Sequence, residues 1–126
     1  MSQPQYFEEN PDIPSNPVDI DVVLHDVSFT LTTDAGVFSR GALDAGTRLL
    51  VTADLPLPGS GTFLDLGCGV GPIALTLALR RPGARVWAVD VNQRAVQWCR
   101  TNARRAGADN VRAVPVDAVP ANVRFD

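Results

Sequence analysis

The sequence predicts an α/β fold built on a parallel β-sheet, and two observations support this prediction. Three short β-prone segments, at residues 62–66, 85–90 and 111–116, alternate with two segments of helical character. Such alternation is typical of a parallel sheet with helices packed on its faces. The first of these segments is also apolar along most of its length, as expected for a strand that is buried on both sides.

The N-terminal part of the chain is predicted to be an extended arm followed by a β-hairpin. Residues 1–17 contain four prolines among polar residues, which favours an extended arm. The hairpin is expected over residues 20–32, where two β-prone runs are separated by His25 and Asp26. In this turn His25 is expected to be an exposed, solvated imidazole without a catalytic role.

A glycine-rich turn joins the first predicted strand of the parallel sheet to the first predicted helix. Gly67, Gly69 and Gly71 occupy alternate positions, and Pro72 then opens an apolar helical segment. Glycines allow the backbone to turn sharply and let a ligand approach main-chain atoms with no Cβ in the way. A glycine turn alone is weak evidence for a binding site, so the surrounding residues decide what it holds.

The residues around this turn favour a cationic ligand over a phosphate. Dinucleotide-binding loops follow the pattern G-x-G-x-x-G, whereas Gly71 comes one residue early and Pro72 lacks the N–H that a phosphate would need. Asp65, two residues before Gly67, would repel a phosphate and attract a cation. S-adenosylmethionine carries an ammonium and a sulfonium and no phosphate, so it suits this loop.

Two further acids follow the next two predicted strands. Asp90 ends the segment 85–90, 19 positions after Gly71, where an acid can bind the hydroxyls of a ribose. Asp117 directly follows the segment 111–116. Because ligands of open α/β sheets bind beyond the carboxyl ends of the strands, both acids are expected beside Asp65 in one crevice.

The second predicted helix has clear start and stop signals. Asn92 is a good N-cap residue, and Gly107 is a good C-terminal stop. Between them, small apolar residues recur on one arc and arginines on the other, which predicts an amphipathic helix packed on the sheet. Trp98 lies at the border of the apolar arc and is expected to have a packing role.

The glycine loop resembles motif I of the Rossmann-like, S-adenosylmethionine-dependent methyltransferases, in which an acid and an apolar residue precede G-x-G-x-G. Residues 33–39 and 43–50 add a resemblance to the small-domain group of that family, which includes bacterial ribosomal RNA guanine-N2 methyltransferases. The resemblance covers roughly residues 5–126. It implies a three-layer sandwich with a parallel sheet core, S-adenosylmethionine as cofactor, ribosomal RNA as partner, and methyl transfer to the exocyclic N2 of a guanine.

The same resemblance assigns roles to individual residues. It implies that the motif I residues hold the methionine portion, that Asp90 binds the ribose, that Asp117 and the Ala118 backbone bind the adenine, and that Val91 packs on the adenine face. Residues 33–39 are either a connector whose Val37 and Phe38 fill the core or a flap over the adenosine end of the ligand. The full expected cofactor set is Phe38, Asp65, Gly67, Cys68, Gly69, Gly71, Asp90, Val91, Asp117 and Ala118.

No catalytic residue is assigned from this sequence. The family's catalytic signature, Asn-Pro-Pro, is expected a few residues beyond Asp126. Residues 18–126 are therefore interpreted as the N-terminal part of a single methyltransferase domain of about 200 residues, with its cofactor-binding half at 62–126 and its C-terminal part absent. A short strand, the fourth of the sheet, is predicted to begin at residue 123.

Composition excludes several classes of protein. The chain has no apolar run of about 18 residues and no signal-peptide core, so we expect a cytoplasmic protein without a membrane span. Its two cysteines lack metal-ligand spacing, so no metal is expected, and they are interpreted as reduced, space-filling residues. All 11 basic residues are arginines. Arginines suit an RNA backbone, but a solvated helix face explains them equally well.

Three alternatives stay open at the level of the sequence. In the first alternative, the cofactor is the same but the methyl acceptor is an adenine, a protein glutamine or a small molecule instead of a guanine. A second alternative is a fragment that binds S-adenosylmethionine without catalysing a reaction. The third is a nicotinamide-dependent dehydrogenase, which the positions of Gly71 and Pro72 disfavour.

Overall fold

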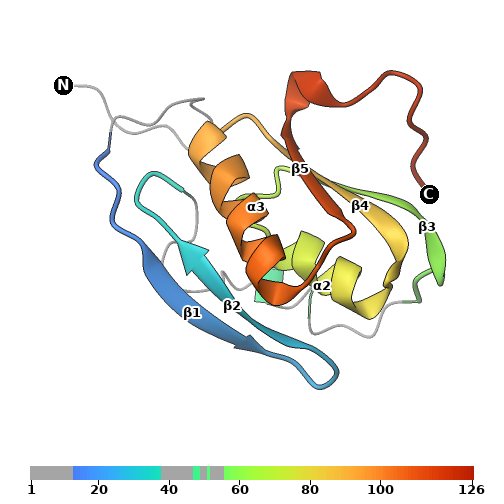
Figure 1. Cartoon of the computed structure of the whole chain (residues 1–126), viewed down its shortest axis with the longest axis horizontal. Coiled ribbons are helices and arrows are strands. Elements are labelled where there is room, and N and C mark those ends of the chain that lie inside the picture. The colour runs from blue at the N-terminus through green and yellow to red at the C-terminus, as the bar shows by residue number, and fades with distance from the viewer. Residues whose placement is uncertain (1–12, 38–46, 49–50, 52–55) are drawn as a thin grey trace.

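The computed structural model describes residues 13–37, 47–48, 51 and 56–126 (Figure 1). The described elements are β1 (Val18–Val23), β2 (Ser28–Thr33), β3 (Ser60–Leu66), α2 (Pro72–Arg80), β4 (Gly83–Asp90), α3 (Gln93–Ala106), β5 (Val111–Pro115) and the 3₁₀ turn η1 (Val116–Ala118). β1 and β2 form an antiparallel hairpin. β3, β4 and β5 form a parallel sheet in that spatial order, which confirms the predicted α/β fold.

Helices α2 and α3 cover the same face of the parallel sheet. Each connects neighbouring parallel strands in the order β3-β4-β5, and right-handed crossovers then place α2 and α3 on one side. Phe63, Val86 and Ala113 point to this side and are buried. Leu64 and Leu66 alternate with them and are 40% and 70% exposed on the other face. Of the three layers expected, the described residues form the sheet and one helical layer.

The helix boundaries follow the predicted signals closely. Pro72 is the first residue of α2, where its missing N–H leaves no bond unmade. In α3 the Asn92 side chain accepts a hydrogen bond from the Ala95 N–H, and Gly107 ends the helix in the left-handed conformation. Both α3 predictions are confirmed.

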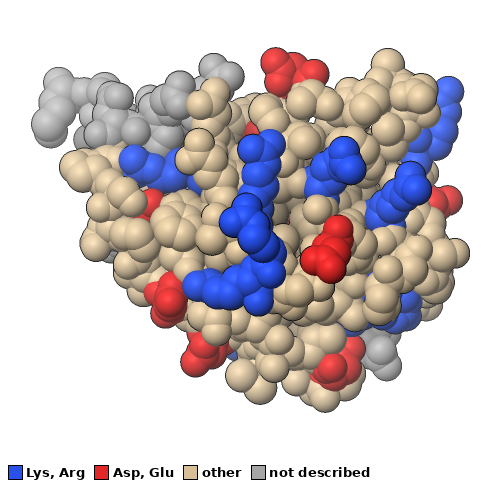
Figure 2. All heavy atoms as spheres, viewed as in Figure 1, with Lys and Arg blue, Asp and Glu red and all other residues tan. Residues whose placement is uncertain are grey.

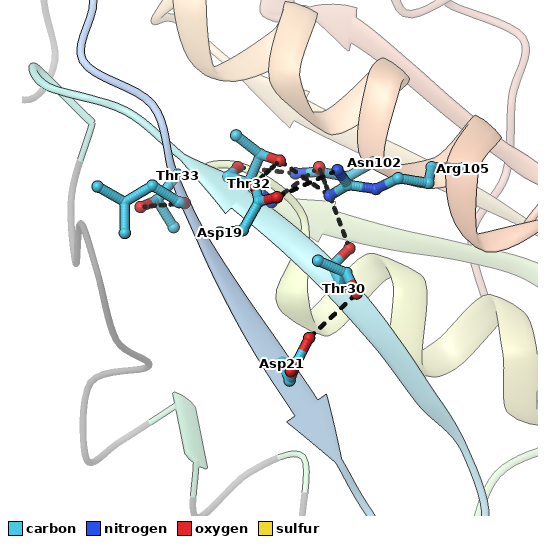
Figure 3. A network of polar contacts seen from close by, with 8 residues as sticks. Asp19, Asp21, Thr30, Thr32, Thr33, Asn102 and Arg105 are labelled. Carbon is cyan, nitrogen blue, oxygen red and sulfur yellow. Dashed lines mark hydrogen bonds and ion pairs between the residues drawn. The ribbon is translucent and has the colours of Figure 1, made fainter.

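The hairpin packs against α3 through a buried polar residue (Figure 3). Asn102 is fully buried, and its Oδ1 accepts from the Thr32 N–H at 3.0 Å. Its Nδ2 donates to the carbonyls of Thr32 and Val70, both at 3.0 Å. The Asn102 amide therefore bonds to β2 as a neighbouring strand would, and it also holds Val70 within the glycine loop.

The turn of the hairpin is fastened to the end of α2. Asp26 accepts from the Arg80 Nε at 2.8 Å and from Nη2 at 3.1 Å. The hydrogen bonds from Arg80 lower the pKa of Asp26 below its ordinary value. His25 lies beside it with its side chain 66% exposed, as expected for a turn histidine.

Three boundary predictions need correction. The third strand of the parallel sheet was expected to run to Val116, but β5 ends at Pro115, which has no N–H for the ladder. Asp117 thus lies in η1 rather than at a strand end. Residues 123–126 do not form a strand; Asp126 donates its N–H to the Thr62 carbonyl and accepts the Thr62 N–H on Oδ2, both at 2.7 Å, but no ladder continues from it.

Candidate cofactor site

The glycine loop lies at the carboxyl end of β3 and is fastened to the neighbouring strand. The N–H groups of Gly67 and Cys68 both donate to the Val89 carbonyl, at 2.7 and 3.0 Å. Gly67, Gly69 and Gly71 all have positive φ, at 77°, 56° and 105°. Other residues rarely adopt this conformation, so the turn needs glycine at these positions.

The three glycines differ in what surrounds them. A Cβ built on Gly67 or Gly69 would meet no atom within 4 Å, so both border open space. A Cβ on Gly71 would lie 2.8 Å from the Cys99 Sγ and 2.9 Å from the Leu75 Cδ1. Gly67 and Gly69 therefore leave room for a ligand, whereas Gly71 allows α3 to pack closely against the loop.

Asp65 carries a buried carboxyl group that is only partly satisfied. The residue is 8% exposed, and its Oδ2 has no hydrogen-bond partner. Burial raises the pKa of this carboxyl to about 6; the nearby charge of Asp90 also raises it, against a hydrogen bond from the Ala74 N–H. That N–H belongs to the first turn of α2, which otherwise leaves it without a partner. The free oxygen is suited to a cationic hydrogen-bond donor.

The Asp90 carboxylate holds the loop and the next helix together. Its Oδ2 accepts from the Gly69 N–H at 2.9 Å, and its Oδ1 accepts from the Asn92 N–H at 2.9 Å. Each carboxylate oxygen has a second lone pair, so Asp90 can still accept hydroxyl groups. Asp65 and Asp90 lie on paired strands near their carboxyl ends, as predicted.

The residues expected at the adenine lie at the same edge of the sheet. Val91 follows β4 and is 37% exposed. Asp117 and Ala118 follow β5 in η1 and are exposed. Because β4 and β5 are parallel, their carboxyl ends meet at this edge.

The Cys68 thiol points into the core. The side chain is buried, and its Sγ lies 3.3 Å from the Gly69 carbonyl, to which it donates. A hydrogen bond with Cys99, together with burial, raises the pKa of the Cys68 thiol. This inert thiol fills space, which leaves the backbone of Cys68 for any ligand contact.

Phe38 lies outside the described residues. The segment 34–37 before it is described, and Val37 is 4% exposed within the core. Gly36 accepts a hydrogen bond through its carbonyl from the Asn92 Nδ2 at 3.0 Å. The segment thus passes beside the N-terminus of α3.

Asp34, whose role was not predicted from the sequence, accepts several hydrogen bonds. Its side chain is 1% exposed and accepts from the Ser15 hydroxyl at 2.6 Å and from the Trp98 indole N–H at 2.8 Å. Burial opposes ionisation, but these donors and the backbone N–H groups of Asn16 and Ala35 outweigh it and lower the pKa of Asp34. An isolated acid after a strand carries no local signal of this role, because its partner Trp98 lies 64 positions away.

One face of the molecule is rich in arginine. Figure 2 shows arginine side chains gathered over α3 on the viewed face. Within the described ranges, no group of three His, Cys, Asp or Glu side chains is arranged to hold a metal, and no helix is long and apolar enough to cross a membrane.

Curated relatives match most of this chain but extend well beyond it. YbxB of Bacillus subtilis (strain 168) is 38% identical over 112 residues, which is 89% of this chain and 56% of YbxB. Ribosomal RNA small subunit methyltransferase C of Pseudomonas putida (strain GB-1) is 37% identical over 102 residues, covering 79% of this chain and 30% of the relative. The chain thus spans about half or less of the length of these relatives.

Solved structures share the fold. The 16S rRNA N2 methyltransferase RsmC of T. thermophilus, solved with AdoMet and guanosine, matches with a TM-score of 0.73 and 27% identity, over 92% of this chain and 33% of RsmC. M. jannaschii TYW2, solved with AdoMet, matches at a TM-score of 0.55 and 14% identity, over 89% of this chain and 54% of TYW2, and shows the fold alone.

A family model also matches most of the chain. The model described as "Methyltransferase small domain" covers residues 28–126, from the second hairpin strand through the glycine loop to the last residue. The matched region contains Asp65, Asp90 and all three loop glycines. The chain therefore belongs to the methyltransferase small domain family.

Proposed function

We propose that this protein is an S-adenosylmethionine-dependent methyltransferase that transfers a methyl group to the exocyclic N2 of a guanine in ribosomal RNA. The observation that carries the proposal is the buried Asp65 carboxyl, whose Oδ2 has no partner beside a glycine loop that borders open space. A buried carboxylate with one oxygen unpaired is costly, and a ligand cation bound to that oxygen would reduce the cost.

The residues present fit this cofactor. Asp65 would receive the ammonium of the methionine portion, with Gly67, Cys68 and Gly69 lining it through their backbone. Asp90 would accept the ribose hydroxyls on its remaining lone pairs. Val91, Asp117 and Ala118 would surround the adenine, and Phe38 would close over the adenosine. Gly71 supports this arrangement indirectly, by letting α3 approach the loop.

Methyl transfer mainly requires that the methyl donor and the acceptor are held in the correct position. Bound S-adenosylmethionine supplies an electrophilic methyl group on a sulfonium, and its transfer is an in-line displacement that needs no covalent nucleophile on the protein. The residues of this chain hold the donor and keep water from it, as the burial around Asp65 suggests.

The substrate proposal is supported by the relatives. Two kinds of evidence agree: several relatives are named ribosomal RNA small subunit methyltransferase C, and the RsmC neighbour was solved with guanosine. The arginines over α3 in Figure 2 are compatible with an RNA partner. An enzyme that modifies bacterial ribosomal RNA would work in the cytoplasm.

Transfer of a labelled methyl group tests this proposal. The protein is incubated with methyl-labelled S-adenosylmethionine and either unmodified small ribosomal subunits or their free RNA, and the RNA is digested to nucleosides. We expect label in N2-methylguanosine. Label in methyladenosine, or in protein only, would overturn the substrate. Binding of S-adenosylhomocysteine without transfer to any acceptor would instead indicate a cofactor-binding module.

A further inference from the structure

We propose that Asn92 is a positioning residue of the cofactor site, which joins Asp90 and the segment 34–37 into one wall of the ribose pocket. The inference rests on the proposed function, because it assigns a role to Asn92 within that site. It concerns a residue whose predicted role was only to cap α3.

Asn92 makes three separate connections from a buried position. The residue is 2% exposed. Its Oδ1 accepts from the Ala95 N–H at 3.1 Å, which caps α3. Its Nδ2 donates to the Gly36 carbonyl at 3.0 Å, and its backbone N–H donates to the Asp90 Oδ1 at 2.9 Å. Helix capping needs only the first of these bonds, so the amide donor has a different purpose.

The segment 34–37 is held against α3 at two further points. The Arg94 Nη1 donates to the Ala35 carbonyl at 2.7 Å. The Trp98 indole N–H donates to the Asp34 carboxylate at 2.8 Å. With the Asn92 bond to Gly36, three consecutive residues of the segment are tied to three side chains of the α3 N-terminal region. Such a segment has one defined position relative to the sheet edge.

This arrangement places the segment beside the ribose-binding acid. The Asp90 carboxylate already accepts the Gly69 N–H on one oxygen and the Asn92 N–H on the other. A ligand hydroxyl must therefore reach the remaining lone pairs between the glycine loop and the residues that Asn92 holds. Losing the Asn92 amide donor would free Gly36 and loosen one side of this pocket while leaving Asp90 in place.

Asn92→Ser separates the proposed role from helix capping. Serine is as good an N-cap as asparagine, so α3 keeps its cap. Serine has no side-chain amide, however, so the hydrogen bond to the Gly36 carbonyl is lost. We expect the dissociation constant for S-adenosylhomocysteine to rise about fivefold, the equivalent of one hydrogen bond. In the methyl-transfer assay the KM for S-adenosylmethionine should rise to a similar extent with kcat nearly unchanged.

A second variant and a matched control show whether weaker binding comes from the lost Gly36 hydrogen bond or from a general loss of stability. Asn92→Asp has the size of asparagine and also caps, but it cannot donate to Gly36, so it should weaken binding at least as much. Arg80→Gln removes the ion pair with Asp26 in the hairpin turn, which β2 separates from Gly36, and should leave the dissociation constant unchanged.

Hydrogen exchange of the amides at 34–37 distinguishes the proposed role from an effect on the stability of α3. In the wild type, S-adenosylhomocysteine should slow exchange of the amides at 34–37; in Asn92→Ser this protection should be lost while α3 stays protected. Wild-type affinity in both Asn92 variants, or an equal loss in Arg80→Gln, would overturn this inference alone. A wild type that binds no S-adenosylhomocysteine would overturn the proposed function as well.

Discussion

At the scale of single residues, the site contains an acid that the folded protein would be more stable without. Asp65 is buried with one oxygen unpaired, and its pKa is raised to about 6. In the unfolded chain this carboxyl would titrate near 4. Strained or unsatisfied groups of this kind are typically retained at functional sites.

The raised pKa of Asp65 predicts how stability depends on pH. Between about pH 4 and pH 6 the folded state retains a proton that the unfolded state has lost. The contribution of Asp65 to the free energy of unfolding is therefore fully present below about pH 4, falls as the pH rises, and is lost above about 6. The difference between the pKa of Asp65 in the folded and the unfolded chain corresponds to about 3 kcal/mol in the free energy of unfolding.

Asp65→Asn should remove this dependence. Asparagine has the same shape and can still accept from the Ala74 N–H, but it carries no charge to bury. Urea unfolding at pH 8 should show the variant more stable than the wild type by on the order of 1–3 kcal/mol, with little difference at pH 4. Parallel stability profiles of the two proteins across this range would contradict the account of Asp65.

Substitutions of two loop glycines are expected to affect different properties, stability for Gly71 and ligand binding for Gly69. Gly71→Ala places a Cβ against the Cys99 Sγ and Leu75 Cδ1 of the core, so it should lower the free energy of unfolding by about 1–3 kcal/mol. The side chain of Gly69→Val would point into open space, although valine is strained at this positive φ, and we expect the variant to lose S-adenosylhomocysteine binding while circular dichroism shows the β-structure retained. Retained binding in Gly69→Val would mean that the loop does not face the ligand.

At the scale of the elements, side chains rather than a backbone ladder join the hairpin to α3. Asn102 pairs with the backbone of Thr32, and Arg105 donates to the Thr30 carbonyl at 2.9 Å and to the Thr32 hydroxyl at 2.9 Å (Figure 3). Arg100 likewise donates to the Ala113 carbonyl at 2.8 Å. Several arginines of α3 therefore act as connectors between elements as well as charges on the surface.

Asn102 is predicted to be the residue on which this junction depends most. Asn102→Leu would leave the Thr32 N–H, the Thr32 carbonyl and the Val70 carbonyl buried without this partner. We expect a loss of about 3 kcal/mol or more in urea unfolding. Thr101→Ala, at an exposed neighbouring position, should change stability by less than about 0.5 kcal/mol. Equal stability of the two variants would show that the Asn102 bonds contribute nothing net.

At the scale of the whole molecule, the sequence predicted what depends on local chemistry. The strand, glycine loop and helix from β3 to α2 were predicted, because glycine, proline and apolar residues act within a few positions. The cap at Asn92 and the stop at Gly107 have the same local origin. The α/β order and the nearness of Asp65 and Asp90 follow from the rule that parallel strands end at one edge.

What the sequence did not predict depends on partners that are distant along the chain. Asp34 meets Trp98, and Asn102 meets Thr32 70 positions away. Asn110, which follows α3, donates to the carbonyls of Ala78 and Arg81 at the end of α2 and of Ala84 in β4. No propensity or spacing rule reports such contacts, because they exist only once the hairpin, α2 and α3 are packed.

Calorimetric titration of the protein with S-adenosylhomocysteine and, separately, NADH tests the central claim most directly, with Asp90→Ala as the matched variant. We predict one S-adenosylhomocysteine bound per chain, no measurable NADH binding, and an affinity in Asp90→Ala that is weaker by on the order of 1–3 kcal/mol, because the ribose loses a charged acceptor. Tight binding of NADH, or an S-adenosylhomocysteine affinity that Asp90→Ala leaves unchanged, would contradict the claim that these carboxylates and glycines form an adenosyl-sulfonium site.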